Sequence, residues 1–106
     1  MMERGEIRWY KFKPPDKERP VVVLTRDSAI QVLGEITIAP ITSTIRGIST
    51  EVPLDERDGM KGGCAINLDH VQTVARGKLG ALITKLSETK MAQLKSALLF
   101  AFGFDD

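Results

Sequence analysis

The sequence predicts a mainly β protein, a small twisted barrel against which one C-terminal helix packs. Three observations support this prediction. Short runs of β-forming residues alternate with turns that contain Gly or Pro, one of these runs has no polar face, and apolar residues recur at helical spacing near the C-terminus. The chain has 106 residues, of which 42% are hydrophobic, and a single cysteine. We therefore expect one domain over residues 1–106, with a core built without a disulfide.

The run without a polar face is Val21–Leu24, four consecutive apolar residues that follow Arg19 and Pro20. Such a run is typical of a central strand that is covered on both sides. Proline has no N–H to give to a β-ladder and holds the preceding residue in an extended conformation, so Pro20 is expected to start the strand. The core should then hold the guanidinium of Arg19 at a fixed place, one residue outside the strand and within reach of solvent.

Residues 6–12 predict the first strand of the barrel. Ile7 and Trp9 share one face, and the apolar phase then shifts by one residue at Tyr10, which predicts a bulge or a twist. A charged segment with two prolines follows at residues 13–18. Proline and charge together are typical of an exposed loop, so we expect this segment to connect the first two strands.

A short helical turn and another strand are expected after Leu24. The polar residues 25–28 can cap one turn over residues 29–33, and Gly34 can close it. Residues 36–39 then alternate between apolar and polar side chains as a strand does. Pro40 should mark the end of this strand, beside a cluster of hydroxyl residues.

The middle of the chain predicts two more strands. The first follows a turn at residues 46–47 and presents four alternate residues on one face: Ile48, Thr50, Val52 and Leu54. After a polar, glycine-bearing connection at residues 55–63, Cys64–Ile66 is short and apolar enough to be a core strand. We interpret Cys64 as a small buried hydrophobe, because no neighbour in the sequence would lower its pKa enough to make it a nucleophile.

The last third of the chain predicts two strands and the helix. Residues 71–74 and 79–86 are the strands, divided by a turn at residues 76–78. Ser87 is a candidate N-cap and Gly103 can close the helix. Between them, the apolar residues at helical spacing are Met91, Leu94, Leu98, Ala101 and Phe102.

The charge balance argues against a protein that coats nucleic acid by bulk charge. Fifteen basic and fourteen acidic residues give a net charge of +1, so any nucleic-acid site must be local. The first 26 residues hold such a local excess, with seven basic residues against four acidic ones. No apolar run is long enough to span a membrane and no leader-like segment is recognisable, so we expect a cytoplasmic protein without membrane contact.

The sequence contains no recognised metal or cofactor motif. With one histidine and one cysteine there is no HExxH or CxxC, so neither a metal nor another cofactor is expected. If the protein is an enzyme, its chemistry must come from Arg, Thr and Ser side chains, from His70 or from backbone donors. These groups suit a phosphodiester, whose transition state gathers negative charge on its non-bridging oxygens. RNA also brings its own nucleophile, the 2'-hydroxyl, so no metal is needed to activate water.

Six short motifs follow one another along the chain: Arg4–Ile7, Arg19–Leu24, Ala39–Ser43, Thr50–Val52, Asn67–Val71 and the helix that begins at Leu86–Ser87. In this combination the chain resembles the MazF/PemK family of toxin endoribonucleases over nearly its full length. The resemblance implies an SH3-like barrel of the MazF/CcdB toxin fold and a homodimer. It implies sequence-specific, metal-independent cleavage of single-stranded RNA (mRNA) to 2',3'-cyclic phosphate and 5'-hydroxyl ends, which inhibits translation and growth. It also implies a cognate MazE-like antitoxin whose tail occupies the RNA groove, and DNA binding by the complex of the two.

The resemblance also assigns site residues. The family's catalytic arginine falls on Arg19 and its catalytic threonine on Thr42, and we expect both to hydrogen-bond the scissile phosphate as it becomes pentacovalent. The family account also lets the arginine shuttle protons, which a guanidinium resists. His70 stands where the family often has glutamine, so a base contact or an interface is favoured over a general base. The residues expected to bind RNA are Lys13, Lys17, Arg26, Ser43, Asp69 and His70; Ser43 has an equally plain interpretation as a turn hydroxyl.

Two further points bear on the function. Many relatives have a longer loop before the arginine with a Gly-Ser-Glu-Gln run, whereas this chain has only Pro14–Glu18, so its groove contacts need not follow theirs. The alternative function is that of a CcdB-like toxin, which uses the same barrel to poison DNA gyrase without cutting nucleic acid. That function depends on a C-terminal Trp-Gly-Ile, whereas this chain ends Phe102–Asp106. A catalytically silent RNA-binding barrel would lack Arg19 or Thr42.

Overall fold

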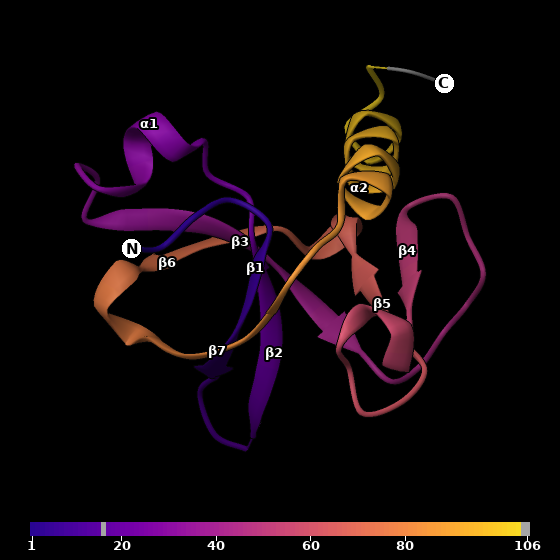
Figure 1. The fold of residues 1–106 in the computed structure, drawn as a ribbon, viewed down its shortest axis with the longest axis horizontal. Coiled ribbons are helices and arrows are strands. Elements are labelled where there is room, and N and C mark those ends of the chain that lie inside the picture. Colours follow the sequence, from indigo (N-terminus) through magenta and orange to yellow (C-terminus); the bar gives the residue numbers. More distant parts are fainter. Residues whose placement is uncertain (16, 105–106) are drawn as a thin grey trace.

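A seven-stranded antiparallel sheet, bent round on itself, makes up most of the molecule (Figure 1). The computed structural model describes residues 1–15 and 17–104. Its strands lie in the order β4-β5-β3-β2-β1-β7, and β6 pairs with β3 off this path. The strands are β1 Glu6–Lys11, β2 Glu18–Val23, β3 Glu35–Thr42, β4 Glu51–Leu54, β5 Cys64–Asn67, β6 Gln72–Ala75 and β7 Leu79–Lys85. The predicted mainly β class is confirmed.

Two α-helices accompany the sheet, together with three single 3₁₀ turns. The helices are α1 Asp27–Ile30 and α2 Glu88–Ala101, and the 3₁₀ turns are η1 Glu56–Asp58, η2 Leu68–His70 and η3 Arg76–Lys78. Helix α2 stands beside β4 and β5 (Figure 1). None of the helices in the described part is long and apolar enough to cross a membrane.

The predicted C-terminal helix is confirmed at both ends. The Ser87 side chain accepts a hydrogen bond from the main-chain N–H of Lys90 (3.2 Å), and Gly103 has the left-handed φ of +78° that closes a helix. Leu94 is buried on the predicted apolar face. The prediction is wrong at Phe102, which is 57% exposed because the helix ends at Ala101.

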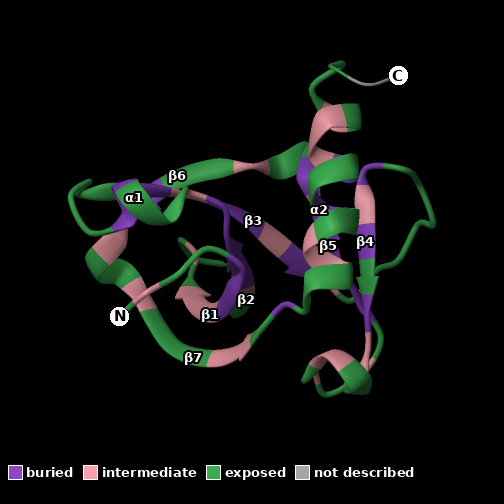
Figure 2. Ribbon diagram, turned by 45° about the horizontal axis from the view of Figure 1, so that its top comes forward, coloured by how far each residue is buried: buried purple, intermediate pink, exposed green. Residues whose placement is uncertain are grey.

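The predicted central strand is confirmed, with cores on both faces of the sheet. All of Val21–Leu24 is buried, and β2 lies between β1 and β3 (Figure 2). Val22 and Leu24 pack into one apolar cluster with Ile66, whereas Val21 and Val23 pack into a second cluster with Ile38. Alternate side chains of a strand point to opposite faces, so a strand with a core on each side has no room for a polar residue.

The start of β2 differs from the prediction. The strand begins two residues before Pro20, at Glu18, so Arg19 lies inside the β1–β2 ladder, opposite Tyr10. The ladder with β3 begins only at Val21, so Pro20 needs no N–H on that side. Strand β1 shows the predicted irregularity as two register shifts against β7. Asp16, within the predicted loop, lies outside the described residues.

Strand β3 continues through the proline that was expected to end it. Along one edge of β3, residues 35–38 pair with β6 and residues 41–42 pair with β5. Pro40 lies between the residues that pair with β6 and those that pair with β5. No described strand pairs with it along this edge, so its lack of an N–H costs no hydrogen bond there. The strand therefore reaches Thr42.

The helical turn α1 also differs from its prediction. It spans Asp27–Ile30, and its N-cap residue Arg26 forms no side-chain capping hydrogen bond. Gly34, which was expected to close the turn, does not have the positive φ of a closing glycine. The carboxylate of Asp27 instead accepts the main-chain N–H of Arg4 (2.7 Å), which holds the N-terminal segment against the turn.

The strand predicted from Ile48 begins later, at Glu51, and Ile48 is 45% exposed. The Glu51 carboxylate accepts the main-chain N–H groups of Arg46 and Gly47 (both 3.0 Å), so the preceding residues fold back as a loop. The predicted strands at residues 64–66, 71–74 and 79–86 are confirmed as β5, β6 and β7 within one or two residues at each end. η3 forms the predicted turn between the last two.

Candidate functional site

Arg19 and Thr42 lie at adjoining ends of two neighbouring strands. The antiparallel register of β2 and β3 pairs Val21 with Pro40. Continuing this register by two residues places Arg19 opposite Thr42, and opposite residues of an antiparallel pair point to the same face. Arg19 is exposed and forms no ion pair with another described residue. Continued in this way, the register puts the two side chains on the same face of the sheet.

A local hydrogen bond orients the hydroxyl of Thr42. Its Oγ1 accepts the main-chain N–H of Thr44 at 3.1 Å. A threonine hydroxyl has one proton to donate and two lone pairs to accept with. Because the Thr44 N–H uses a lone pair, the proton of Thr42 stays available for an acceptor outside the chain. Such a side-chain turn also explains how β3 ends.

A hollow of about 230 Å³ opens beside Thr42. One wall comes from the strand ends at Pro20 and Ile41–Ser43, and the other comes from residues 60–64. The structure thus brings the predicted Thr42 and Ser43 together with a segment, Met60–Gly63, that sequence reasoning treated only as a connection. The pattern that could have identified it is a lysine followed by two glycines in a polar loop.

Cys64 forms part of this hollow but is not a reactive thiol. The residue is buried at the start of β5, and this burial raises the pKa of its thiol. The carboxylates of Asp58 and Asp55 raise the pKa further, because they oppose a thiolate. The prediction of a small buried hydrophobe is confirmed.

Lys13 lines a second hollow, beside the β1–β2 connection. This hollow has a volume of about 360 Å³ and is lined by Tyr10, Phe12, Lys13, Pro14, Pro15 and Gln72. The rings of Tyr10 and Phe12 meet edge to face, with centroids 4.8 Å apart. Tyr10 is also the residue opposite Arg19 in the β1–β2 ladder. An aromatic surface beside a lysine suits an unpaired base and its phosphate. Lys17 is exposed in the same loop.

Asp69 and His70 are not brought to Thr42 within one copy of the chain. Both lie in η2, whereas Thr42 pairs with Ala65 at the other end of β5. One carboxylate oxygen of Asp69 accepts the hydroxyl of Thr50 at 2.6 Å, so Asp69 has a structural role. His70 is exposed, with its Nδ1 at 3.4 Å from the side-chain nitrogen of Asn67.

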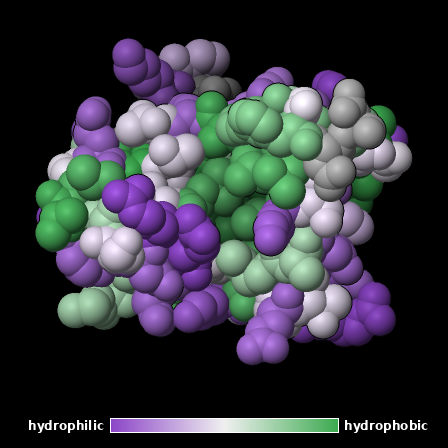
Figure 3. Space-filling view, turned by 90° about the horizontal axis from the view of Figure 1, so that it is seen from above, coloured by the Kyte–Doolittle hydropathy of each residue, from purple (hydrophilic) through white to green (hydrophobic). Residues whose placement is uncertain are grey.

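Arg26 also lies away from the strand ends that hold Arg19 and Thr42. It follows the opposite end of β2 and lines a third hollow, of about 370 Å³, between α1 and α2. Figure 3 shows the apolar floor of this face, to which Leu24, Leu33 and Leu98 contribute. Within the described residues, no group of His, Cys, Asp and Glu is arranged to hold a metal ion.

A bent antiparallel sheet with a C-terminal helix packed against it defines a small barrel-like fold of the mainly β class. Residues 3–102 match the family model for the PemK-like, MazF-like toxin of type II toxin-antitoxin system. The chain belongs to this family, and the resemblance seen in its motifs is confirmed.

Known relatives agree with this assignment. The chain is 39% identical over 90 residues to endoribonuclease MazF3 of Mycobacterium tuberculosis, a match that covers 85% of this chain and 87% of that protein. It is similar in structure to the Mycobacterium tuberculosis toxin MazF-mt6, with a TM-score of 0.86, 36% identity and coverage of 95% and 99% of the two chains. An endoribonuclease in complex with its cognate antitoxin, from a mycobacterial species, has the same fold at 20% identity (TM-score 0.88, 100% and 99% covered). The CcdB alternative gains no support from these comparisons.

Proposed function

We propose that this protein is an endoribonuclease toxin that cleaves single-stranded mRNA at a specific sequence, without a metal, to 2',3'-cyclic phosphate and 5'-hydroxyl ends. The observation that carries the proposal is that Arg19 and Thr42 belong to adjoining ends of the paired strands β2 and β3, in a chain of the PemK/MazF family. Relatives named as endoribonucleases support it. The cleavage inhibits translation and growth, and it takes place in the cytoplasm, where mRNA is found.

The proposed reaction is an internal transesterification. The 2'-oxygen of one nucleotide bonds to the adjacent phosphorus and gives its proton to water, and the bond from phosphorus to the 5'-oxygen breaks as that oxygen gains a proton from water. Arg19 and Thr42 donate hydrogen bonds to the non-bridging oxygens, where negative charge gathers. The guanidinium stays protonated throughout, because an arginine side chain does not give up its proton in proteins. His70 is not assigned as a base, since it lies at the far end of β5 from Thr42.

The proposed working unit is a homodimer with an RNA groove shared between the two copies. Two observations favour it. A net charge of +1 cannot hold a polyanion unless basic residues are gathered locally, and pairing two copies lengthens the basic track. The face between α1 and α2 also carries apolar side chains, including Leu33 (44% exposed) and Phe102 (57% exposed), that a second copy would cover. The mass from light scattering tests this point.

The proposed protein partner is a MazE-like antitoxin with an acidic tail that competes with RNA for the groove. The complex of a relative of the same fold with its cognate antitoxin supports this part of the proposal. Binding of DNA by the toxin–antitoxin complex belongs to the same proposal. An acidic peptide should displace RNA from the toxin at low salt and lose this ability as salt rises, because both ligands depend on charge.

The experiment that tests the function combines chelation with mapping of the cut ends. A long single-stranded RNA is incubated with the purified protein in excess EDTA, and the new 5' ends are tested for ligation before and after phosphorylation. We expect cleavage in EDTA and 5' ends that ligate only after phosphorylation. Protein with Arg19→Ala, purified identically, controls for contaminating ribonuclease. Complete inhibition by EDTA, or ends that already carry 5'-phosphate, would refute the mechanism.

A further inference from the structure

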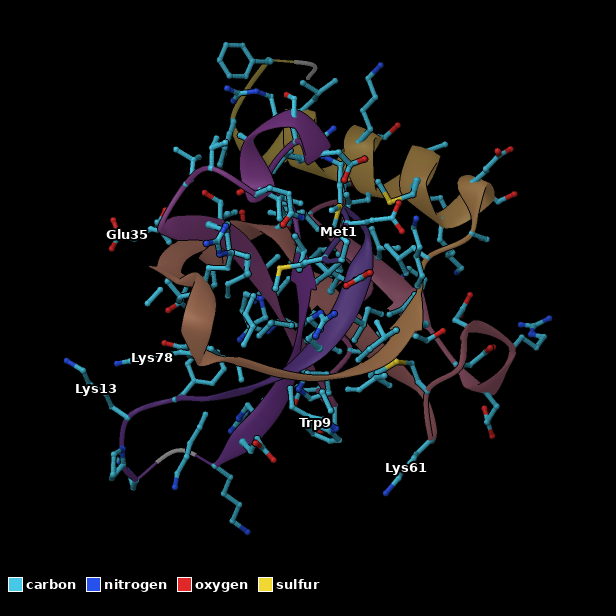
Figure 4. The ribbon with its side chains drawn as sticks, turned by 60° about the vertical axis from the view of Figure 1, so that its left-hand side comes forward. Met1, Trp9, Lys13, Glu35, Lys61 and Lys78 are labelled. Carbon is cyan, nitrogen blue, oxygen red and sulfur yellow. The ribbon has the colours of Figure 1, made fainter. Side chains whose placement is uncertain are left out.

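The segment Lys61–Gly63 faces the predicted catalytic threonine across one hollow, and the function proposed above gives it no role. The hollow of about 230 Å³ is lined on one side by Thr42 and Ser43 and on the other by this segment. Lys61 is exposed and extends from its loop into solvent (Figure 4). It forms no ion pair with any residue in the described ranges. A lysine without an ion-pair partner in these ranges therefore lines the same hollow as Thr42 and Ser43.

The chain on either side of this segment is firmly held. Before it, Asp55 and Asp58 cap η1 reciprocally: Asp55 accepts the N–H of Arg57 (2.9 Å), and Asp58 accepts the N–H of Asp55 (2.9 Å). Met60 donates its N–H to the Asp55 carbonyl (3.3 Å) and packs against the core. After the segment, Cys64 enters the β5 ladder opposite Leu54. The segment is thus a short span between two fixed points.

Between these points, the main-chain N–H groups of Lys61, Gly62 and Gly63 make no main-chain hydrogen bond within the described residues. Three consecutive N–H groups without a main-chain partner, beside an ammonium group without an ion-pair partner in the described part of the chain, are donors available to an anion. Phosphate oxygens of RNA are the anions that the proposed function would bring to this hollow.

The two glycines are not explained by the fold itself. Neither Gly62 nor Gly63 has a positive φ. A Cβ at Gly62 would meet nothing within 4 Å, and one at Gly63 would meet only the Ile45 side chain at 3.8 Å. Gly59 is the contrast, because it has a φ of +94° and a Cβ there would lie 2.6 Å from Thr84. Glycine also serves where a ligand must approach the backbone closely, and this use fits Gly62 and Gly63.

We propose that Lys61, Gly62 and Gly63 form a second phosphate-binding element of the RNA site, which holds a phosphate next to the one held by Arg19 and Thr42. The Lys61 ammonium attracts the phosphate, and the N–H groups of the two glycines orient it by hydrogen bonds. The element positions the RNA strand across Thr42 and does not touch the scissile bond. This inference rests on the proposed function, since it requires that RNA is the ligand.

The test measures binding of an uncleavable, 2'-O-methylated oligonucleotide of mixed sequence at several salt concentrations. Lys61→Ala should weaken binding about tenfold at low salt and reduce the slope of log affinity against log salt by about 0.7, the value for one phosphate contact on a single strand. Lys61→Arg should restore the slope. Lys78→Ala is the matched control, because it removes the same charge from an exposed position in η3.

A second test compares a variant of the two glycines with a control variant at a third glycine. Gly62→Ala combined with Gly63→Ala should weaken binding without lowering the melting temperature, because neither Cβ meets a close neighbour. Gly77→Ala, at another glycine with open space around its Cβ and no positive φ, should leave binding unchanged. If the glycine variant fails to fold, Lys61→Ala still decides the question.

The outcomes separate this inference from the proposed function. If the wild-type protein neither binds nor cleaves RNA, the proposed function fails and this inference fails with it. If the wild-type protein cleaves RNA but Lys61→Ala and Lys78→Ala change the affinity and the salt slope equally, only the second phosphate-binding element is refuted.

Discussion

Two connections lie on either side of the strand ends that hold Arg19 and Thr42, and they are built in different ways. The connection between β1 and β2, residues 12–17, contains two prolines and two lysines, and its described residues other than Phe12 are exposed. The connection between β4 and β5, residues 55–63, is tied down by a reciprocally capped 3₁₀ turn before it ends in three free N–H donors. Figure 4 shows Lys13 and Lys61 extending outward from these two separate loops.

The comparison shows what composition reveals about a binding loop. The first loop is recognisable in the sequence because prolines and charges mark an exposed turn. The second is less uniformly exposed, and its place beside Thr42 comes from where β3 ends and β5 begins, since Thr42 pairs with Ala65 and so brings Gly63 to the same edge. A one-dimensional pattern cannot show that two distant segments share a hollow. In the proposed site, the strand ends supply the chemistry and both loops supply affinity.

The largest effect is expected at the strand ends. Arg19→Ala and Thr42→Ala should each lower the rate of cleavage about 100- to 1000-fold, because each removes one donor to the developing negative charge. The fold should persist, since Arg19 is exposed and Thr42 is the last residue of β3. Single-turnover cleavage and a thermal melt check both points. Ser43→Ala is the control from the same hollow and should cost much less. A folded Arg19→Ala protein with near-wild-type cleavage would show that the chemistry lies elsewhere.

The next effect concerns the first loop. Lys13→Ala combined with Lys17→Ala should reduce the salt slope of single-stranded RNA binding by about 1.4, the value for two phosphate contacts. The cleavage rate at saturating RNA should stay nearly unchanged, because neither lysine is placed at the scissile phosphate. The same binding titration as for Lys61→Ala measures this, so the two loops can be compared directly. An unchanged salt slope would show that the first loop makes no phosphate contact, and only the second loop would then be expected to bind RNA.

A smaller effect is expected at His70. His70→Gln introduces the residue that the family resemblance leads us to expect there, so the cleavage rate should stay within about a factor of ten, below the loss that follows removal of a general base. The pH profile of cleavage should also keep its shape, because a base that titrates near neutrality would give the profile a limb that the variant lacks. A change in the recognised sequence is the expected consequence. If the variant instead loses the acidic limb of the pH profile and its cleavage rate falls 100-fold or more, His70 is the general base.

The fold could be predicted where one local rule decided the outcome. The continuous run Val21–Leu24 required a core on each face, and the Ser87 cap and Gly103 bounded α2. Predictions of strand ends failed where the pairing with neighbouring strands decided how far a strand continues. Pro40 is harmless within β3 only because two different strands pair on either side of it, and this pairing is not visible in the sequence.

The site shows the same division. Arg19 and Thr42 were identified by resemblance, and their proximity follows from the β2–β3 register, which no local pattern specifies. Asp69 and His70 were placed with them because they share a motif with the family, but in one copy of the chain they lie beyond the other end of β5.

The smallest effect concerns the turn that supports the second loop. The Arg57 side chain and its main-chain N–H both hydrogen-bond the carboxylate of Asp55, and together they hold the pKa of Asp55 below its usual range. A carboxyl whose pKa is lowered by folding contributes stability above its unfolded pKa of about 3.9, and this contribution is lost as the pH falls through the folded value. Asp55→Asn should therefore lower the melting temperature slightly at pH 7 and less at low pH.

The neighbouring acid Glu56→Gln is the control, because Glu56 is exposed and forms no ion pair with another described residue. Melting curves of the two variants and the wild type at neutral and acidic pH give the comparison. If Asp55→Asn lowers the melting temperature equally at both pH values, the charge of Asp55 does not stabilise the turn. If the pH dependence holds, the oligonucleotide assay on Asp55→Asn should also show weaker binding at pH 7, since a looser turn holds Lys61 and the two glycine N–H groups less well.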